Sequence, residues 1–147
     1  MKRNKYSQKN LIKGEGLLAF SEVCFDITIL DIGPHATALL REMNVAIKSG
    51  MPIVVIILAA TIADVVLNEG KVDLVHREDT SGMGMDWLTS AERRKLDWLR
   101  GLRNRLVHYE GPISGMGGTT YDEEILRRDA DSALSAISPL LAGLEQF

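Results

Sequence analysis

The sequence has few residues suited to covalent bracing or to metal chemistry. Its 147 residues include one cysteine, Cys24, so an intramolecular disulfide is excluded. Because Cys24 lies in an apolar stretch, we expect a buried structural thiol. No cysteine and histidine have the spacing of zinc ligands, and neither a metal nor a cofactor is expected. Aromatic residues make up only 5% of the chain, so aliphatic side chains and methionine must fill the core.

Long apolar runs are also lacking. The most apolar segment, residues 51–63, is uncharged over only 13 residues, which is too short to cross a bilayer. The polar, basic start of the chain lacks the features of a signal peptide. With 46% apolar and 25% charged residues, the composition is typical of a soluble globular protein. We therefore expect a cytoplasmic protein without a membrane contact, with a flexible basic tail over residues 1–12 and a single helical domain over 13–147.

Apolar residues recur every three or four positions through most of the chain, which is the period of an amphipathic helix. This spacing predicts helices over residues 17–30, 35–49, 52–68, 90–109 and about 121–144. We expect residues 69–88 to form a connection and Pro139 to kink or break the last helix near Ser138. No repeat and no strand-turn-strand pattern is visible in the sequence. The predicted fold is an all-α, up-and-down bundle of four to five helices.

The fourth predicted helix carries the most informative pattern. Thr89 and Glu92 have the spacing of a capping box at its start. One apolar stripe runs along it through Leu96, Leu99, Leu102, Leu106 and Tyr109. Residues 90–108 hold six basic and two acidic side chains, although the whole chain has a net charge of −3. Such a local basic stripe suits a phosphate-directed site, although on charge alone a solvated helix face is the better explanation.

Asp64 follows directly after the uncharged segment, and the sequence leaves its role open. It either faces solvent near the end of its helix or pairs with a buried arginine, because a buried carboxylate needs a partner.

The last turns of the fourth helix contain Arg103, Asn104 and His108. Histidine side chains titrate near neutral pH and serve as acid or base. Arginine offers a planar fork of donors that matches phosphate oxygens. In a metal-free cleavage of RNA, Arg103 would bind phosphate, His108 would move protons, and Asn104 would orient either group. The simpler alternative is a surface arginine together with a histidine that interacts favourably with the helix dipole.

At these residues the chain resembles the HEPN superfamily of small all-α domains from defence and RNA-processing proteins. The family motif is an arginine, then usually a polar residue, then a histidine after four to six positions, which matches Arg103, Asn104 and His108. The resemblance implies a homodimer with a shared cleft and, in many members, metal-independent RNA cleavage. Some members are toxins paired with a nucleotidyltransferase antitoxin that modifies a tyrosine two places after the histidine. Here Tyr109 follows His108 directly and Glu110 holds that place, so this mode of control is not expected.

Helical geometry limits how Arg103 and His108 can cooperate. They are five residues apart, about 140° around the axis, so they converge only if the helix ends near His108 or a dimer partner supplies one of them. We expect a homodimer whose groove contains His108 from both chains. The alternatives are a non-catalytic HEPN-like bundle that binds a nucleotide or a partner protein, and a purely structural helical dimer.

Overall fold

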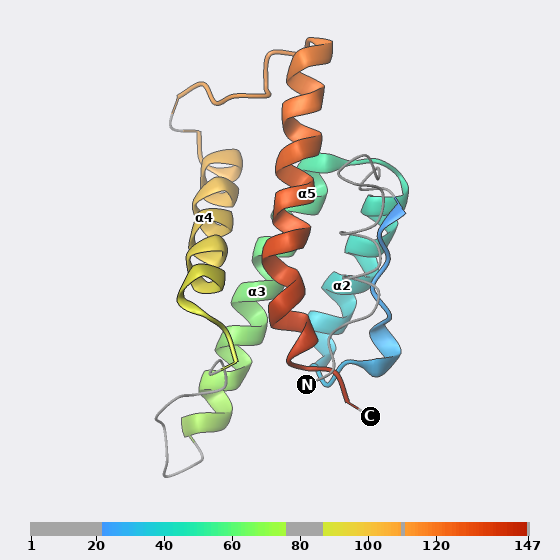
Figure 1. Ribbon diagram of the computed structural model, residues 1–147, viewed down its shortest axis with the longest axis vertical. Coiled ribbons are helices and arrows are strands. Elements are labelled where there is room, and N and C mark those ends of the chain that lie inside the picture. The colour runs from blue at the N-terminus through green and yellow to red at the C-terminus, as the bar shows by residue number, and fades with distance from the viewer. Residues whose placement is uncertain (1–21, 76–86, 110, 147) are drawn as a thin grey trace.

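A computed structural model describes residues 22–75, 87–109 and 111–146, with the side chains of 70–75 excepted. Within these residues the chain forms one 3₁₀ helix and four α-helices: η2 Ile27–Ile29, α2 Pro34–Lys48, α3 Pro52–Val75, α4 Ser90–Val107 and α5 Thr120–Ala142. The four α-helices run alternately up and down, with α3 between α2 and α4 and α5 laid across α3 (Figure 1). The structure therefore confirms the all-α, up-and-down bundle. The predicted tail over residues 1–12 lies outside the described residues.

Contacts made by α3 hold the bundle together. This helix packs against α2, α4 and α5, and side chains such as Val55, Ile56 and Ile62 are fully buried. It continues to Val75, so the first part of the predicted 69–88 connection is helical, because an isolated glycine such as Gly70 does not end a helix. By length and composition, Pro52–Glu69 could also cross a membrane, with a mean hydropathy of 1.9. Central helices of soluble proteins share these properties.

The turn between α2 and α3 is tight, and it confirms the predicted end of the second helix. Gly50 has a φ of 70°, a conformation that favours glycine. The Gly50 amide donates to the Ile47 carbonyl at 3.1 Å, and the Met51 amide donates to the Ala46 carbonyl at 3.0 Å. These bonds satisfy carbonyls at the end of α2 and send the chain back along it as α3.

The helix predicted over residues 17–30 is wrong where the structure describes it. From residue 22 onward the chain is extended apart from η2, and Val23 and Phe25 point into the core while Cys24 lies between them. The Asn44 side chain accepts from the Phe25 amide at 3.1 Å and donates to its carbonyl at 2.9 Å, replacing helical hydrogen bonds. Because successive side chains of an extended chain alternate in direction, Cys24 is exposed, contrary to the expected buried thiol.

Helix α5 continues through Pro139, so of the predicted kink or break the structure excludes the break. Leu140 and Leu141, on the far side of the proline, are fully buried, and this packing holds the last turn in place. The Trp87 indole nitrogen donates to the Pro139 carbonyl at 3.1 Å, which ties the start of the α4 segment to the end of α5. The neighbouring Ser138 hydroxyl donates to the Leu134 carbonyl at 2.6 Å.

Candidate functional site

Helix α4 begins as the sequence predicts, and its end at Val107 leaves the side chain of His108 exposed. The Thr89 hydroxyl accepts from the Glu92 amide at 3.1 Å, and the Glu92 carboxylate accepts from the Thr89 amide at 2.8 Å, which confirms the capping box. Leu99 on the apolar stripe is fully buried. Tyr109 is wrong as a stripe residue: it is 84% exposed, because the helix ends at Val107 and the stripe ends with it.

His108 is the C-cap of α4, with an extended backbone at φ −118° and ψ 109°. Its amide donates to the Asn104 carbonyl at 2.9 Å, and its side chain is exposed. The helix therefore ends at His108, which is one of the two conditions for Arg103 and His108 to converge. Within the described residues, which omit Glu110, the imidazole of His108 makes no hydrogen bond to Arg103 or Asn104. The structure thus leaves the imidazole open to solvent, one turn beyond Asn104.

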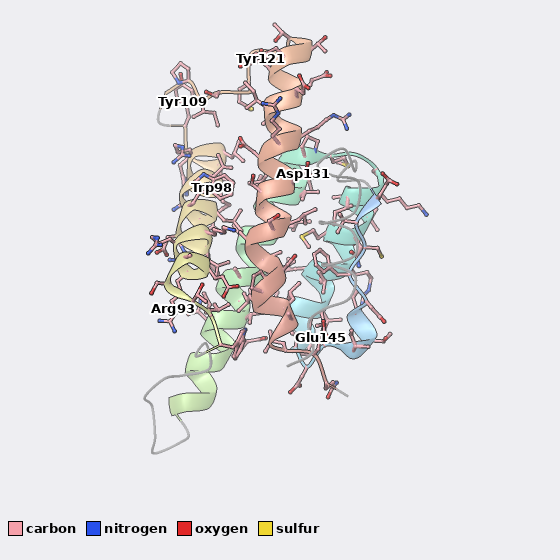
Figure 2. All side chains as sticks on the ribbon, viewed as in Figure 1. Arg93, Trp98, Tyr109, Tyr121, Asp131 and Glu145 are labelled. Carbon is pink, nitrogen blue, oxygen red and sulfur yellow. The ribbon has the colours of Figure 1, made fainter. Side chains whose placement is uncertain are left out.

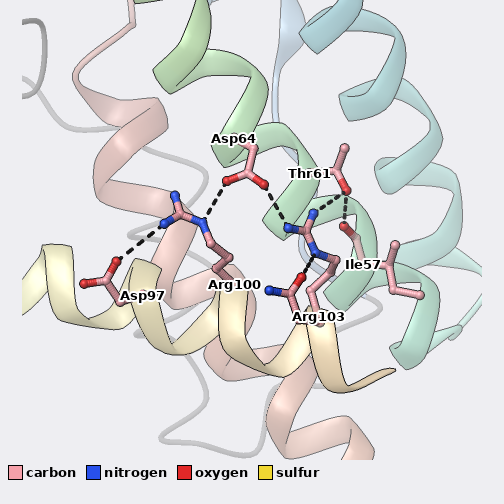
Figure 3. Close-up of polar contacts among 7 residues, drawn as sticks. Ile57, Thr61, Asp64, Asp97, Arg100 and Arg103 are labelled. Atoms are coloured by element: carbon pink, nitrogen blue, oxygen red, sulfur yellow. Dashed lines mark hydrogen bonds and ion pairs between the residues drawn. The ribbon is translucent and has the colours of Figure 1, made fainter. Parts of the chain in front are cut away.

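Arg103 is held from three sides and is 18% exposed (Figure 3). Its Nη2 donates to the Asp64 carboxylate at 2.9 Å. Its Nε donates to the Asn104 amide oxygen at 3.0 Å, and its Nη1 makes a longer contact of 3.4 Å with the Thr61 hydroxyl. The guanidinium plane is therefore fixed between α3 and α4, and Arg103 and Asn104 are in direct contact.

Asp64 joins two arginines of α4 to α3. One of its carboxylate oxygens accepts from Arg103, and the other accepts from the Arg100 Nε at 3.1 Å (Figure 3). Of the two roles that the sequence leaves open for Asp64, the structure has the ion pair, with a side chain 27% exposed. Arg100 itself is 46% exposed, and its Nη1 lies 3.9 Å from the carboxylate of Asp97. Arg100 and Arg103 thus share the inward Asp64, and the exposed Asp97 offsets the second positive charge at the surface of α4.

Thr61 and Arg100 belong to the cluster around Asp64 but were not predicted as site residues from the sequence. Thr61 and Asp64 are three residues apart on α3, and Arg100 and Arg103 are three residues apart on α4. Pairs at this spacing share a helix face. A matching polar pair on each of two helices is therefore a sequence signal for a contact between them.

Two carboxyl groups of α5 lie in partly buried surroundings. Burial raises the pKa of Asp129 above its ordinary value, and the nearby charge of Arg105 opposes that rise. Burial also raises the pKa of Asp131. The charge of Arg105 thus acts on α5. Among the residues that the structure describes, no three His, Cys, Asp or Glu side chains are grouped as metal ligands.

Comparison with known proteins leaves the family open. No family model, no curated protein and no solved structure matches this chain. A function for the chain must therefore be argued from the contacts between α3 and α4 and from the motif at the end of α4.

Proposed function

We propose that this protein is a metal-independent RNA endonuclease of the HEPN type, with Arg103, Asn104 and His108 as its site. One observation carries the proposal: α4 ends at His108, so a solvent-exposed imidazole lies one turn beyond a guanidinium that three partners hold in place. Metal-free phosphate chemistry needs a donor held in place, here Arg103, together with a group that can take or give a proton, here His108.

The proposed reaction begins with attack by a ribose 2′-oxygen on the adjacent phosphorus. The bond to the 5′-oxygen of the next nucleotide breaks, which leaves a 2′,3′-cyclic phosphate and a 5′-hydroxyl. His108 takes the proton from the attacking hydroxyl or gives one to the leaving oxygen. Each terminal nitrogen of Arg103 keeps one N–H beyond its bond in the cluster, and these donors stabilise the extra charge on the phosphate. Asn104 orients Arg103 through its amide oxygen.

The reaction needs an acid and a base, and each chain supplies a single histidine at this site. A symmetric homodimer that brings two copies of the end of α4 together would supply both groups. We therefore include a homodimer in the proposal, in a cytoplasmic protein that acts in defence or as the toxin of a toxin–antitoxin pair. An antitoxin would be its partner in that setting, and a nucleotidyltransferase could fill that role only without modifying a tyrosine two places after His108, where Glu110 stands. Light scattering at micromolar concentration tests the assembly, and a monomer would contradict this part of the proposal.

The test of activity is incubation of the purified protein with end-labelled RNA in EDTA. We expect cleavage by the wild type and a loss of at least about 100-fold for His108→Ala, the usual contribution of an acid or base. The matched control is His35→Ala, which removes another exposed histidine at the start of α2 and should leave the rate unchanged. No cleavage by the wild type, or equal loss in both variants, would reject the nuclease.

A second candidate function is a non-catalytic bundle that binds a nucleotide or a partner protein. It is favoured by the engagement of all three nitrogens of Arg103 with Asp64, Thr61 and Asn104, which gives the arginine a structural role without any substrate. Binding of RNA or a nucleotide by wild type and His108→Ala alike, without cleavage by either, would support this function over the nuclease.

A further inference from the structure

Arg100 and Arg103 share the carboxylate of Asp64 but differ in what they leave free. Arg103 uses all three nitrogens in the cluster. Arg100 is anchored through Nε alone, at 3.1 Å from Asp64, and its Nη1 lies 3.9 Å from Asp97, which is too long for a hydrogen bond. The fork formed by the two terminal nitrogens of Arg100, on a side chain 46% exposed, therefore has one weak partner: Nη1 makes the long ion pair with the exposed Asp97, and Nη2 makes no ion pair or hydrogen bond within the described residues.

Anchoring through Nε makes this fork more than a flexible surface charge. A free arginine loses conformational entropy when it binds an anion, and an arginine already held at Nε loses less. The fork end of a guanidinium is also the end that pairs with two oxygens of a phosphate. Arg100 is thus better prepared to bind a phosphate from solvent than Arg103, whose role in the cluster is to hold α4 on α3.

Arg100, Asn104 and His108 are spaced four residues apart and form one row along α4. Adjacent members lie about 40° apart around the axis, and the row spans about 12 Å from Arg100 to His108. A strand of RNA whose cleaved bond lies at His108 would bring a neighbouring phosphate of the same strand to Arg100. The row is therefore long enough to contact more than one nucleotide.

We propose that Arg100 binds a second phosphate of a single-stranded RNA that lies along this row. The proposal extends the proposed function, since it states that the substrate is a polynucleotide read over several phosphates and not a mononucleotide. The charge of α4 supports RNA as the occupant, because residues 90–108 hold six basic and two acidic side chains. Asp97, which is 74% exposed beside Arg100, opposes binding in part.

The test measures binding of a 2′-O-methylated oligouridylate of about ten nucleotides, whose blocked 2′-oxygens prevent cleavage, over a series of salt concentrations. Arg100→Gln should weaken binding about tenfold at low salt. It should also reduce the slope of log affinity against log salt by about 0.7, the effect of one lost phosphate contact on a single strand. Binding of the matching dinucleotide, which is too short to reach Arg100 from His108, should not change.

Arg94→Gln is the matched control, because it removes an equal charge from an exposed position about 120° around α4 from Arg100. It should leave the salt slope unchanged. Asp97→Asn should tighten binding, since it removes a carboxylate beside the proposed phosphate. Melting temperatures of all variants establish that they are folded.

Equal slopes for Arg100→Gln and Arg94→Gln would overturn the proposal, as would an oligouridylate that does not bind the wild type. The nuclease and the phosphate contact fail separately in this design. A wild type that binds with the Arg100-dependent slope but cleaves no RNA would reject the nuclease and support the contact. Cleavage that depends on His108, together with a salt slope of binding that does not depend on Arg100, would support the nuclease and reject the phosphate contact.

Discussion

Removing the carboxylate of Asp64 should destabilise the fold, because Arg103 would lose its counter-ion while it stays mostly covered. Asp64→Ala deletes two charge-assisted hydrogen bonds, of 2.9 and 3.1 Å. A covered donor left without its charged partner costs about 1.5–3 kcal/mol. Water can replace the bond to Arg100, which is 46% exposed, but replaces much less of the bond to Arg103, which is 18% exposed. We therefore expect a loss of about 2 kcal/mol, nearly all of it from Arg103.

Urea unfolding followed by circular dichroism measures this change, and thermal unfolding should show a melting temperature lower by about 4–8 °C. Asp97→Ala is the matched control: this carboxylate also faces Arg100, but at 3.9 Å and with 74% exposure, so its loss should cost under about 0.5 kcal/mol. A double-mutant cycle of Asp64→Ala with Arg103→Met should give a coupling of at least about 1 kcal/mol. If Asp64→Ala were as mild as Asp97→Ala, the argument that Asp64 fixes Arg103 would be wrong.

Four further substitutions, in two pairs, test the packing of α4 and the charges of α5. Leu102→Asp should lower the free energy of unfolding by about 3–5 kcal/mol in urea, because Leu102 is 7% exposed and an unpaired charge would be buried there. The control Val107→Asp, at a position 46% exposed, should be near neutral. Equal effects of the two substitutions would show that the buried face of α4 is misassigned. Burial raises the pKa of Asp131 above its ordinary 3.8, so ionisation at neutral pH opposes folding. Asp131→Asn should therefore raise the melting temperature at pH 7, with the gain vanishing below pH 3.8. Hydrogen bonds from Thr119 lower the pKa of Asp122, so Asp122→Asn should lower the melting temperature at pH 7. A higher melting temperature for both variants would contradict the two pKa directions.

The helices that could be predicted from the sequence are those whose signals are local. Thr89 and Glu92 cap α4 through side chains three residues apart, and the Leu96–Leu99–Leu102 spacing defines its buried face. Both the cap and the stripe can be read within a window of a few turns. Apolar spacing does not show where a helix ends: it includes Tyr109, although α4 ends at Val107.

Errors in the prediction arise where a distant partner replaces local hydrogen bonds. The segment around Phe25 has helical apolar spacing, yet the Asn44 side chain, 19 residues away, holds its backbone extended. At the other end of the chain, the carbonyl of Pro139 accepts from Trp87, 52 residues away, and buried leucines carry α5 through the proline. Neither contact leaves a pattern in the sequence near the affected segment.

In the candidate site, too, local features could be predicted from the sequence and distant contacts could not. The sequence places Arg103, Asn104 and His108 near the end of one helix, and the structure agrees on where they lie. It could not assign Asp64 to Arg103, because 39 residues separate them. This contact distinguishes the two arginines: Arg103 faces inward and fixes α4 on α3, while Arg100 is half exposed and extends one terminal nitrogen toward the exposed Asp97 (Figure 3).

The two arginines should therefore separate stability from binding. Loss of Arg103 removes an interhelical ion pair, so any effect on RNA would be mixed with an effect on the fold. Loss of Arg100 leaves the Asp64–Arg103 pair in place and removes the more exposed of the two ion pairs with Asp64, so it should affect the fold less. In the whole-molecule view, Tyr109 lies at the end of α4 away from Arg93, in solvent (Figure 2). The row from Arg100 to His108, along which we propose that RNA binds, runs toward this exposed end of α4, while Arg103 holds α4 on α3.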